Sequence, residues 1–248
     1  MTEWALKRFW TEAHAEPGEG GWAVLLDGRP VHTPARAPLL LPTEALAEAV
    51  AAEWQAQEGE VQPGLMPFTR AANSALDKVV PQAGAVADML IEYGDTDLLC
   101  YRAETPEELA AAQAEAWDPL LDWARSALGA PLVATAGVIH VDQPERARAG
   151  LRAAVAGQDA FALTALHDLV TLSGSLVIGL AAQKGVLPAE ELWTRSRVDE
   201  HWQERQWGRD AEAARMEEAR RADFLVASEF HALSRRPARQ GATDKPAL

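Results

Sequence analysis

Cysteine is nearly absent from this sequence, which has only Cys100 among its 248 residues. An intrachain disulfide is therefore excluded, which suits a reducing compartment. With 48% hydrophobic and 24% charged residues, the composition is that of an ordinary globular protein of one large or two modest domains. Cys100 stands between an apolar run and a tyrosine, and we interpret it as a small buried residue rather than a nucleophile.

Basic residues are also scarce, since 23 Lys and Arg stand against 37 Asp and Glu, for a formal net charge of −14. Nucleic-acid-binding proteins usually carry a basic face, so this balance argues against nucleic acid and against an anionic membrane. The longest apolar run, residues 169–182, falls below the roughly 18–20 residues that a membrane span needs. The start of the sequence has no apolar signal core. These features predict a cytoplasmic protein without membrane insertion.

Motifs of the common catalytic sites do not occur. The sequence has no GK[ST] phosphate loop, so no nucleotide is expected, and LSGSLV does not match the GxSxG nucleophile elbow. None of the six histidines stands four residues from another, the spacing of a helical zinc site. We therefore expect a protein that is not an enzyme, with no catalytic residue, metal or cofactor. One alternative stays open, a small metal- or carboxylate-dependent hydrolase using four residues of two helices: His167, Asp168, Glu200 and His201.

The order of the predicted elements is strands first and helices afterwards. Asp27-Gly28 between two apolar runs is a strong hairpin signal, and short strands are expected within residues 22–41. Thr43 then caps a helix with an apolar stripe, and Gly and Pro break the chain at residues 59–66. Helices fill nearly all of the rest, with a break expected at Pro119.

These elements predict an α+β fold with a small β-rich N-terminal domain, made of a hairpin sheet plus a helix, and a larger all-α C-terminal domain. The first domain is expected over residues 1–65 and the second over residues 66–234. Residues 235–248 have too few large apolar side chains to fold and are expected to be a disordered tail.

A helix predicted over residues 188–207 carries tryptophans among charged side chains. On a continuous helix of 100° per residue, Trp193 and Trp207 lie within about 40° of each other. Three charged residues fall between them on that face: Arg197, Glu200 and Glu204.

The two faces of this helix have different interpretations. Val198 and Trp202 lie near the opposite side and are interpreted as the core stripe. Aromatic ends with charged residues between them are typical of protein–protein interfaces. The alternative is that Trp193 and Trp207 are partly buried under neighbouring helices while the charges are solvated.

Several segments together resemble one protein family. In order, they are KRFW, VLLDGRPVHTPARAPLLLPTEALAEAVAAEWQAQ, MPFTRAANSALDKV, DTDLLCYRA, WDPLLDWA, SGSLVIGLA and SRVDEHWQERQWG. The set runs from about residue 7 to residue 232 and resembles the assembly chaperones that bind the α subunit of the ATP synthase catalytic head in mitochondria and α-proteobacteria. The resemblance implies a small α+β domain followed by a helical one. It also implies a chaperone that transiently holds the unassembled α subunit on the surface later used by the β subunit. Eukaryotic relatives would act in the mitochondrial matrix.

The resemblance also gives importance to acidic residues of VDEHWQERQWG. When this importance is carried over to the present sequence, the candidates are Asp199, Glu200 and Glu204, with Trp207. Of these, Asp199 lies off the face that the two glutamates share. With Trp193 and Arg197, they make up the predicted partner-binding residues. Charge reversal at Glu200 and Glu204 is expected to weaken client capture without lowering the melting temperature. A helical scaffold with another client fits the same residues and stays open.

Overall fold

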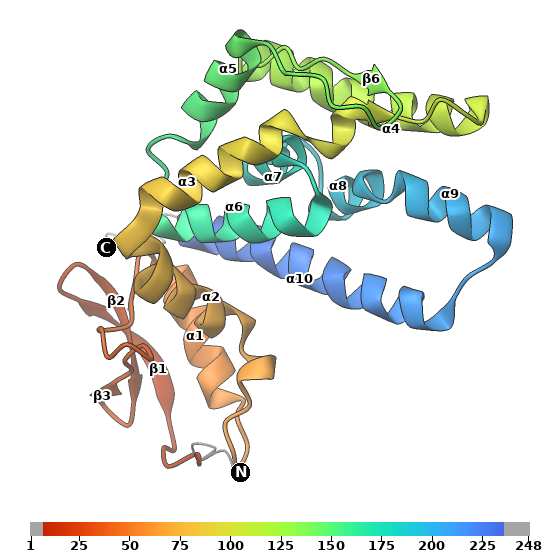
Figure 1. Ribbon diagram of the computed structural model, residues 1–248. Coiled ribbons are helices and arrows are strands. Elements are labelled where there is room, and N and C mark those ends of the chain that lie inside the picture. Colours follow the sequence, from red (N-terminus) through yellow and green to blue (C-terminus); the bar gives the residue numbers. More distant parts are fainter. Residues whose placement is uncertain (1–6, 236–248) are drawn as a thin grey trace, which may run out of the picture. The chain divides into compact units, whose positions relative to one another are not determined.

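The structure, a computed structural model, describes residues 7–235 (Figure 1). Two compact units are distinguished among these residues: the first comprises residues 7–73 and 232–235, and the second is Ser74–His231. The predicted domain boundary after residue 65 lies a few residues before this division. The predicted α+β fold is confirmed, because an antiparallel sheet comes first and helices follow. Residues 236–248, nearly all of the predicted disordered tail, lie outside the described residues.

The sheet of the first unit is built on a predicted hairpin. Its strands are β1 (Ala13–Gly18), β2 (Gly21–Leu26), β3 (Arg29–Pro30) and β4 (Leu40–Leu41), and β2 pairs antiparallel with the other three. Asp27 and Gly28 join β2 to β3 with φ of 47° and 76°, the left-handed conformations that a type I′ turn requires. The hairpin prediction is thus confirmed, whereas β1 was missed.

Helix α1 (Glu44–Gln55) packs on β1 and β2. Thr43 is its N-cap as predicted, and Thr43 Oγ1 accepts the N–H of Leu46 at 3.2 Å. At the other end of α1, the Glu53 carboxylate accepts the N–H groups of Phe68 and Thr69, each at 2.7 Å. These two bonds satisfy free amides at the start of the short helix α2 (Pro67–Ser74).

The second unit is helical and has its core at α6 (Ala160–Ser173) and α7 (Leu176–Gln183), which are buried on nearly all sides. They are mostly apolar because most of their surface is covered by other parts of the unit, while His167 and Asp168 of α6 stay partly exposed. A two-residue parallel pair, β5 (Tyr101–Arg102) and β6 (Thr135–Ala136), also belongs to this unit. The other α-helices of this unit are α3 (Ala83–Glu92), α4 (Glu107–Ala127), α5 (Glu145–Val155), α8 (Ala189–Ser196), α9 (Val198–Trp207) and α10 (Ala211–Arg235), of which the last residues belong to the first unit. Within residues 7–235, no helix combines the length and the apolar character that crossing a membrane would take.

Two buried polar groups fix the turn that leads into α7. Asp97 is fully buried, and its carboxylate accepts the N–H groups of Leu99 and Val177 at 3.0 Å each. Burial raises the pKa of Asp97 to about 6. Ser175 caps α7 by accepting the N–H of Ile178 at 3.0 Å. Burial also raises the pKa of the nearby Cys100 thiol to about 12, which fits its interpretation as an inert core residue.

The break predicted at Pro119 is wrong, because this residue lies inside the 21-residue helix α4. Proline removes one helical N–H bond and crowds the carbonyl four residues earlier. Contacts with α8 hold the same turn in place: Arg195 Nη1 donates to the carbonyl of Ala116 at 2.8 Å, and Trp117 Nε1 donates to the carbonyl of Arg195 at 2.7 Å. Trp117 is itself fully buried. Tertiary packing therefore outweighs the local cost of the proline.

Candidate functional site

A helical hairpin with little burial forms one end of the second unit (Figure 1). Helix α9 runs outward, residues 208–210 turn the chain, and α10 returns beside α9. No residue of α9 is buried, nor is any residue between 211 and 223, whereas Phe224 and Phe230 farther along α10 are. His201 Nε2 of α9 lies 3.1 Å from Glu217 Oε1 of α10 and joins the two helices. We call residues 198–223 the α9–α10 hairpin.

The continuous helix predicted over residues 188–207 is wrong, because Arg197 separates α8 from α9 with φ −114° and ψ 23°. Only 9% of Arg197 is exposed. Its guanidinium donates to Glu200 Oε1 at 2.7 Å and to the carbonyl of Ser173 at 3.3 Å, and it lies 5.0 Å from the centre of the Trp193 ring. Burial lowers the pKa of Arg197. The junction is therefore fixed by contacts with residues of three helices.

The structure also corrects which tryptophan is buried. Trp193 is 2% exposed and packs on Phe224, with ring centres 5.6 Å apart, so it is a core residue. Trp202 was interpreted as core but is only half-buried, with Arg205 over its ring at 5.3 Å. A helical wheel shows which residues share a face, but not which face is covered by another helix. Val198 does pack against the edge of the core, as predicted.

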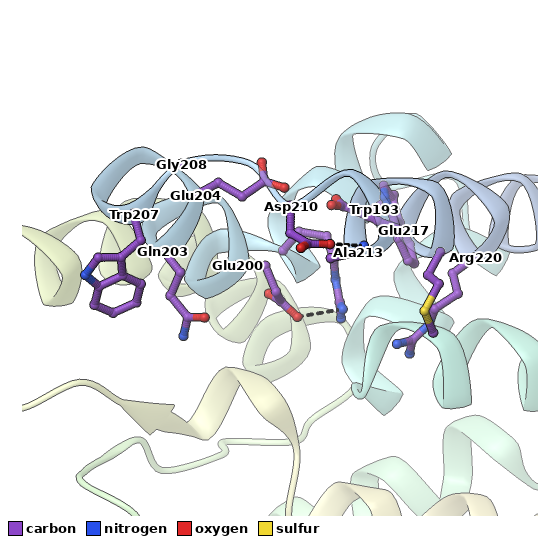
Figure 2. A pocket seen from close by; sticks show the side chains of 12 residues that line it. Trp193, Glu200, Gln203, Glu204, Trp207, Gly208, Asp210, Ala213, Glu217 and Arg220 are labelled. Carbon is purple, nitrogen blue, oxygen red and sulfur yellow. Dashed lines mark hydrogen bonds and ion pairs between the residues drawn. The ribbon is translucent and has the colours of Figure 1, made fainter.

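A cleft of about 410 Å³ opens between α9 and α10 (Figure 2). Five of the six predicted partner-binding residues line it: Trp193, Arg197, Glu200, Glu204 and Trp207. Sequence reasoning missed the second wall, which α10 and the turn before it supply through Asp210, Ala213, Met216, Glu217 and Arg220. The spacing of these α10 residues, at i, i+3, i+4 and i+7, is that of one helix face and is the signal that would have found them.

The sixth predicted residue, Asp199, lies elsewhere. Asp199 Oδ1 accepts a hydrogen bond from Gln113 Nε2 of α4 at 2.6 Å. Gln113 is buried, and its side-chain oxygen accepts the N–H of Ala103 at 2.7 Å. Asp199 therefore holds α9 on α4 and does not line the cleft.

The exposed side chains of the cleft are both apolar and acidic. Trp207 is 79% exposed and Met216 is 63% exposed, which is unusual for side chains of this size. Four carboxylates line the cleft, against two guanidiniums: Glu200, Glu204, Asp210 and Glu217 against Arg197 and Arg220. Such a surface can bind a protein segment that is partly apolar and carries positive charge.

The four residues of the hydrolase alternative do not meet in this cleft. Glu200 lines it, but His167, Asp168 and His201 do not. His167 Nδ1 is bonded to its neighbour Asp168 at 2.9 Å, which raises the pKa of His167, and His201 is bonded to Glu217. Over the described part of the chain, no group of three or more His, Cys, Asp or Glu could hold a metal ion. The four residues of the hydrolase alternative are therefore not brought together in this cleft.

Comparisons with known proteins cover both units. Residues 7–125 match the family model described as ATP12 chaperone protein. The crystal structure of Atp12 from Paracoccus denitrificans is 54% identical, covers 92% of this chain and 98% of that chain, and has a TM-score of 0.90. A protein from Agrobacterium tumefaciens is 40% identical over 92% of this chain and 85% of that chain, with a TM-score of 0.86. Protein atp12, mitochondrial, from Schizosaccharomyces pombe is 26% identical over 82% of this chain and 74% of its own length.

Proposed function

Because the chain belongs to the ATP12 chaperone family, we propose that it is an assembly chaperone of the ATP synthase catalytic head. Its client is the unassembled α subunit, and it shields the surface of that subunit until the β subunit replaces it. It binds and releases this client in the bacterial cytoplasm and catalyses no reaction. Release requires a transient interface rather than a large permanent one.

The observation that carries this proposal is the cleft of the α9–α10 hairpin, which joins an exposed tryptophan to carboxylates. An unassembled subunit exposes an apolar interface ringed by polar groups, so its binder needs aromatic anchors and complementary charge. Trp207 supplies an anchor of this kind, and Glu204 supplies charge on the same helix. Covering the indole with a client removes apolar surface from water.

Affinity capture tests the proposal. The tagged protein is incubated separately with purified unassembled α subunit and with the purified assembled catalytic head. We expect capture of the free α subunit and not of the head, since the β subunit covers the client surface in the head. Equal capture of both, or capture of neither, would contradict the proposed function. Capture from the native lysate with mass spectrometry then distinguishes this client from that of a scaffold protein.

A variant pair connects capture to the cleft. Trp207→Ala should weaken α-subunit binding by roughly ten- to thirtyfold, the loss typical of an aromatic anchor. Gln206→Ala is the matched control, because Gln206 is the exposed neighbour on α9 and does not line the cleft. Equal binding by the two variants would place the client contact elsewhere on the protein.

A further inference from the structure

We propose that residues 133–141, which we call the β6 loop, form a second binding surface for the client. This surface receives an extended, apolar segment that carries positive charge, and the segment adds a strand to the open edge of β6. The inference deepens the proposed function and rests on it for the identity of the client, the unassembled α subunit. The chemistry of the segment is argued from the loop itself.

The β6 loop exposes an unusual number of large apolar side chains. Of the nine such side chains that are exposed among the described residues, four lie in this short segment: Val133, Val138, Ile139 and Val141. Val138 is 93% exposed and Ile139 is 78% exposed. Figure 1 shows β6 apart from α9 and α10, and no residue of the loop lines their cleft. Exposed apolar side chains that gather in one place mark an interaction surface.

Hydrogen bonds on both sides of Val138 and Ile139 hold this apolar tip in place. Before the tip, the N–H of Gly137 donates to the carbonyl of Arg102 at 2.8 Å. After it, His140 Nδ1 lies 3.1 Å from the hydroxyl oxygen of Tyr101. Both partners belong to β5, so the tip is preorganised on this strand. Preorganisation lowers the entropy that a binding partner must overcome.

The backbone of β6 has an open edge. Among the described residues β6 pairs with β5 alone, and Ala136 stands opposite Arg102. In this parallel pair Arg102 bonds the residues on either side of Ala136, so Ala136 directs its own N–H and C=O away from β5. Ala136 is exposed, and its carbonyl has only a long contact with Thr135 Oγ1, at 3.4 Å. An open edge beside exposed apolar side chains is a template for an added strand.

The charge around the β6 loop favours a basic segment. A Cβ added to Gly137 would lie 2.8 Å from Glu104 Oε1, so this carboxylate lies against the backbone that leads into the tip. Glu104 is exposed, and its side chain has no ion pair or hydrogen bond within residues 7–235. Asp142, just after the loop, is 86% exposed, although Arg148 lies 3.4 Å away. An acidic segment would be repelled, and so would a second copy of this chain with its net charge of −14.

The edge can be tested without any client. The probe is the peptide acetyl-Lys-Val-Thr-Val-Lys-amide, and the matched control has glutamate in place of each lysine. The NMR amide signal of Ala136, assigned by its absence in Ala136→Pro, should shift with the lysine peptide and much less with the glutamate peptide. Glu104→Gln should reduce this difference, whereas Glu115→Gln, at an exposed position farther along α4, should not. No shift with the lysine peptide, or equal shifts with both peptides, would overturn the proposal.

Capture of purified α subunit tests whether the client uses this surface. The double variant Val138→Ser/Ile139→Ser should weaken capture roughly tenfold or more, because the client no longer covers apolar side chains there. Val80→Ser is the control, since Val80 is exposed outside the loop, and the double variant should melt like this control. Ala136→Pro, which removes the outward N–H, should also weaken capture, whereas Ala136→Val, which keeps this N–H, should not.

The outcomes separate this surface from the proposed function. If the serine double variant captures normally while Trp207→Ala does not, the β6 surface fails and the proposed function stands. If the unmodified protein captures no α subunit, the proposed function fails, and the peptide titration still decides the edge. A dimer of the unmodified protein that dissociates in Ala136→Pro, measured by analytical ultracentrifugation, would mean that a second copy occupies the edge and would also overturn the proposal.

Discussion

Glu200 and Glu204 lie one turn apart on α9 and look equivalent in the sequence, yet the structure gives them different partners. Glu200 holds the guanidinium of the buried Arg197, whereas Glu204 has a long ion pair with the exposed Arg209. Removing the partner of a buried charge leaves that charge uncompensated, while an exposed ion pair contributes little to stability. The expectation that charge reversal affects both positions alike therefore needs revision.

We predict that Glu200→Lys lowers stability and that Glu204→Lys does not. The loss at Glu200 should be on the order of 1–3 kcal/mol, because Arg197 is buried but Glu200 itself is half-exposed. Thermal unfolding followed by circular dichroism should show a melting temperature several degrees lower for Glu200→Lys and an unchanged one for Glu204→Lys. Both variants should capture less α subunit. Equal melting temperatures would mean that Arg197 does not need its carboxylate partner.

The buried Asp97 predicts a pH dependence of stability. Burial raises its pKa from 3.8 to about 6 in the folded protein, so the folded state binds the proton more tightly than the unfolded state does. The contribution of this group to stability therefore falls as the pH rises from about 4 to about 6, by on the order of 2–3 kcal/mol, and stays low above that range.

Urea unfolding at several pH values, compared between the unmodified protein and Asp97→Asn, isolates this contribution. The variant should be less stable at low pH, because an amide cannot accept both N–H bonds through its two terminal atoms. Its stability should nevertheless fall less between about pH 4 and pH 6 than that of the unmodified protein. Parallel pH profiles for the two proteins would contradict the assignment.

At the scale of elements, the sequence predicted what local signals determine. The Asp27-Gly28 turn, the Thr43 cap and the helical periodicity each act within a few residues, and the elements they predict are present. The two wrong predictions, at strand β1 and at Pro119, concern features that depend on contacts between residues far apart in the sequence. Strand β1 has the sequence AHAEPG, with few residues that favour strands, and exists because it pairs with β2. Pro119 is tolerated because α8 packs on that turn.

The candidate site was predicted only in part, because it too depends on contacts between residues far apart in the sequence. Five of its residues were found because they share one face of a short segment, and that grouping persists across the break at Arg197. What the segment could not show is that Phe224 covers Trp193. The break is stabilised by the carbonyl of Ser173, more than twenty residues away in the sequence. Likewise, a wheel of one helix contains no information about the helix that forms the opposite wall. Met216 and Glu217 therefore become part of the site only in the fold.

The close packing of α6 against α7 predicts that adding one methyl group at Gly179 destabilises the protein. A Cβ added to Gly179 of α7 would lie 2.8 Å from Val170 Cγ2, closer than real Cβ contacts, and 3.0 Å from Leu166 Cδ1, which is tighter than most. Gly179→Ala should therefore destabilise the protein by about 1–3 kcal/mol despite the better helix propensity of alanine. The control is Gly84→Ala in α3, where a Cβ meets nothing within 4 Å, and it should be neutral or stabilising by up to about 1 kcal/mol.

Denaturant unfolding of the two glycine variants measures this difference. It also tests whether the missing side chain of Gly179 is what allows α6 and α7 to approach closely. If Gly179→Ala were as stable as Gly84→Ala, the two central helices would be packed less closely than the structure has them.

Across the whole chain, burial is distributed unevenly. The central helices α6 and α7 are buried almost throughout, whereas α9 has no buried residue. An isolated helix of ten residues is not stable in water, so α9 is held by a few contacts: Arg197 at its start, Asp199 with Gln113, and His201 with Glu217. The α9–α10 hairpin should therefore open at much lower free energy than the core.

Native-state hydrogen exchange can measure that difference and connect it to client binding. We predict that amides of residues 198–223 exchange well before those of α6 and α7, because opening the hairpin exposes little apolar surface. Gln113→Ala removes a contact of α9 outside the cleft and should speed exchange in α9, and also at Ala103, whose N–H loses its acceptor. Bound α subunit should slow exchange in residues 198–223 most, since binding stabilises only the closed hairpin. Uniform protection across the second unit would instead mean that hairpin and core open together, and that this segment has no separate opening for a client to suppress.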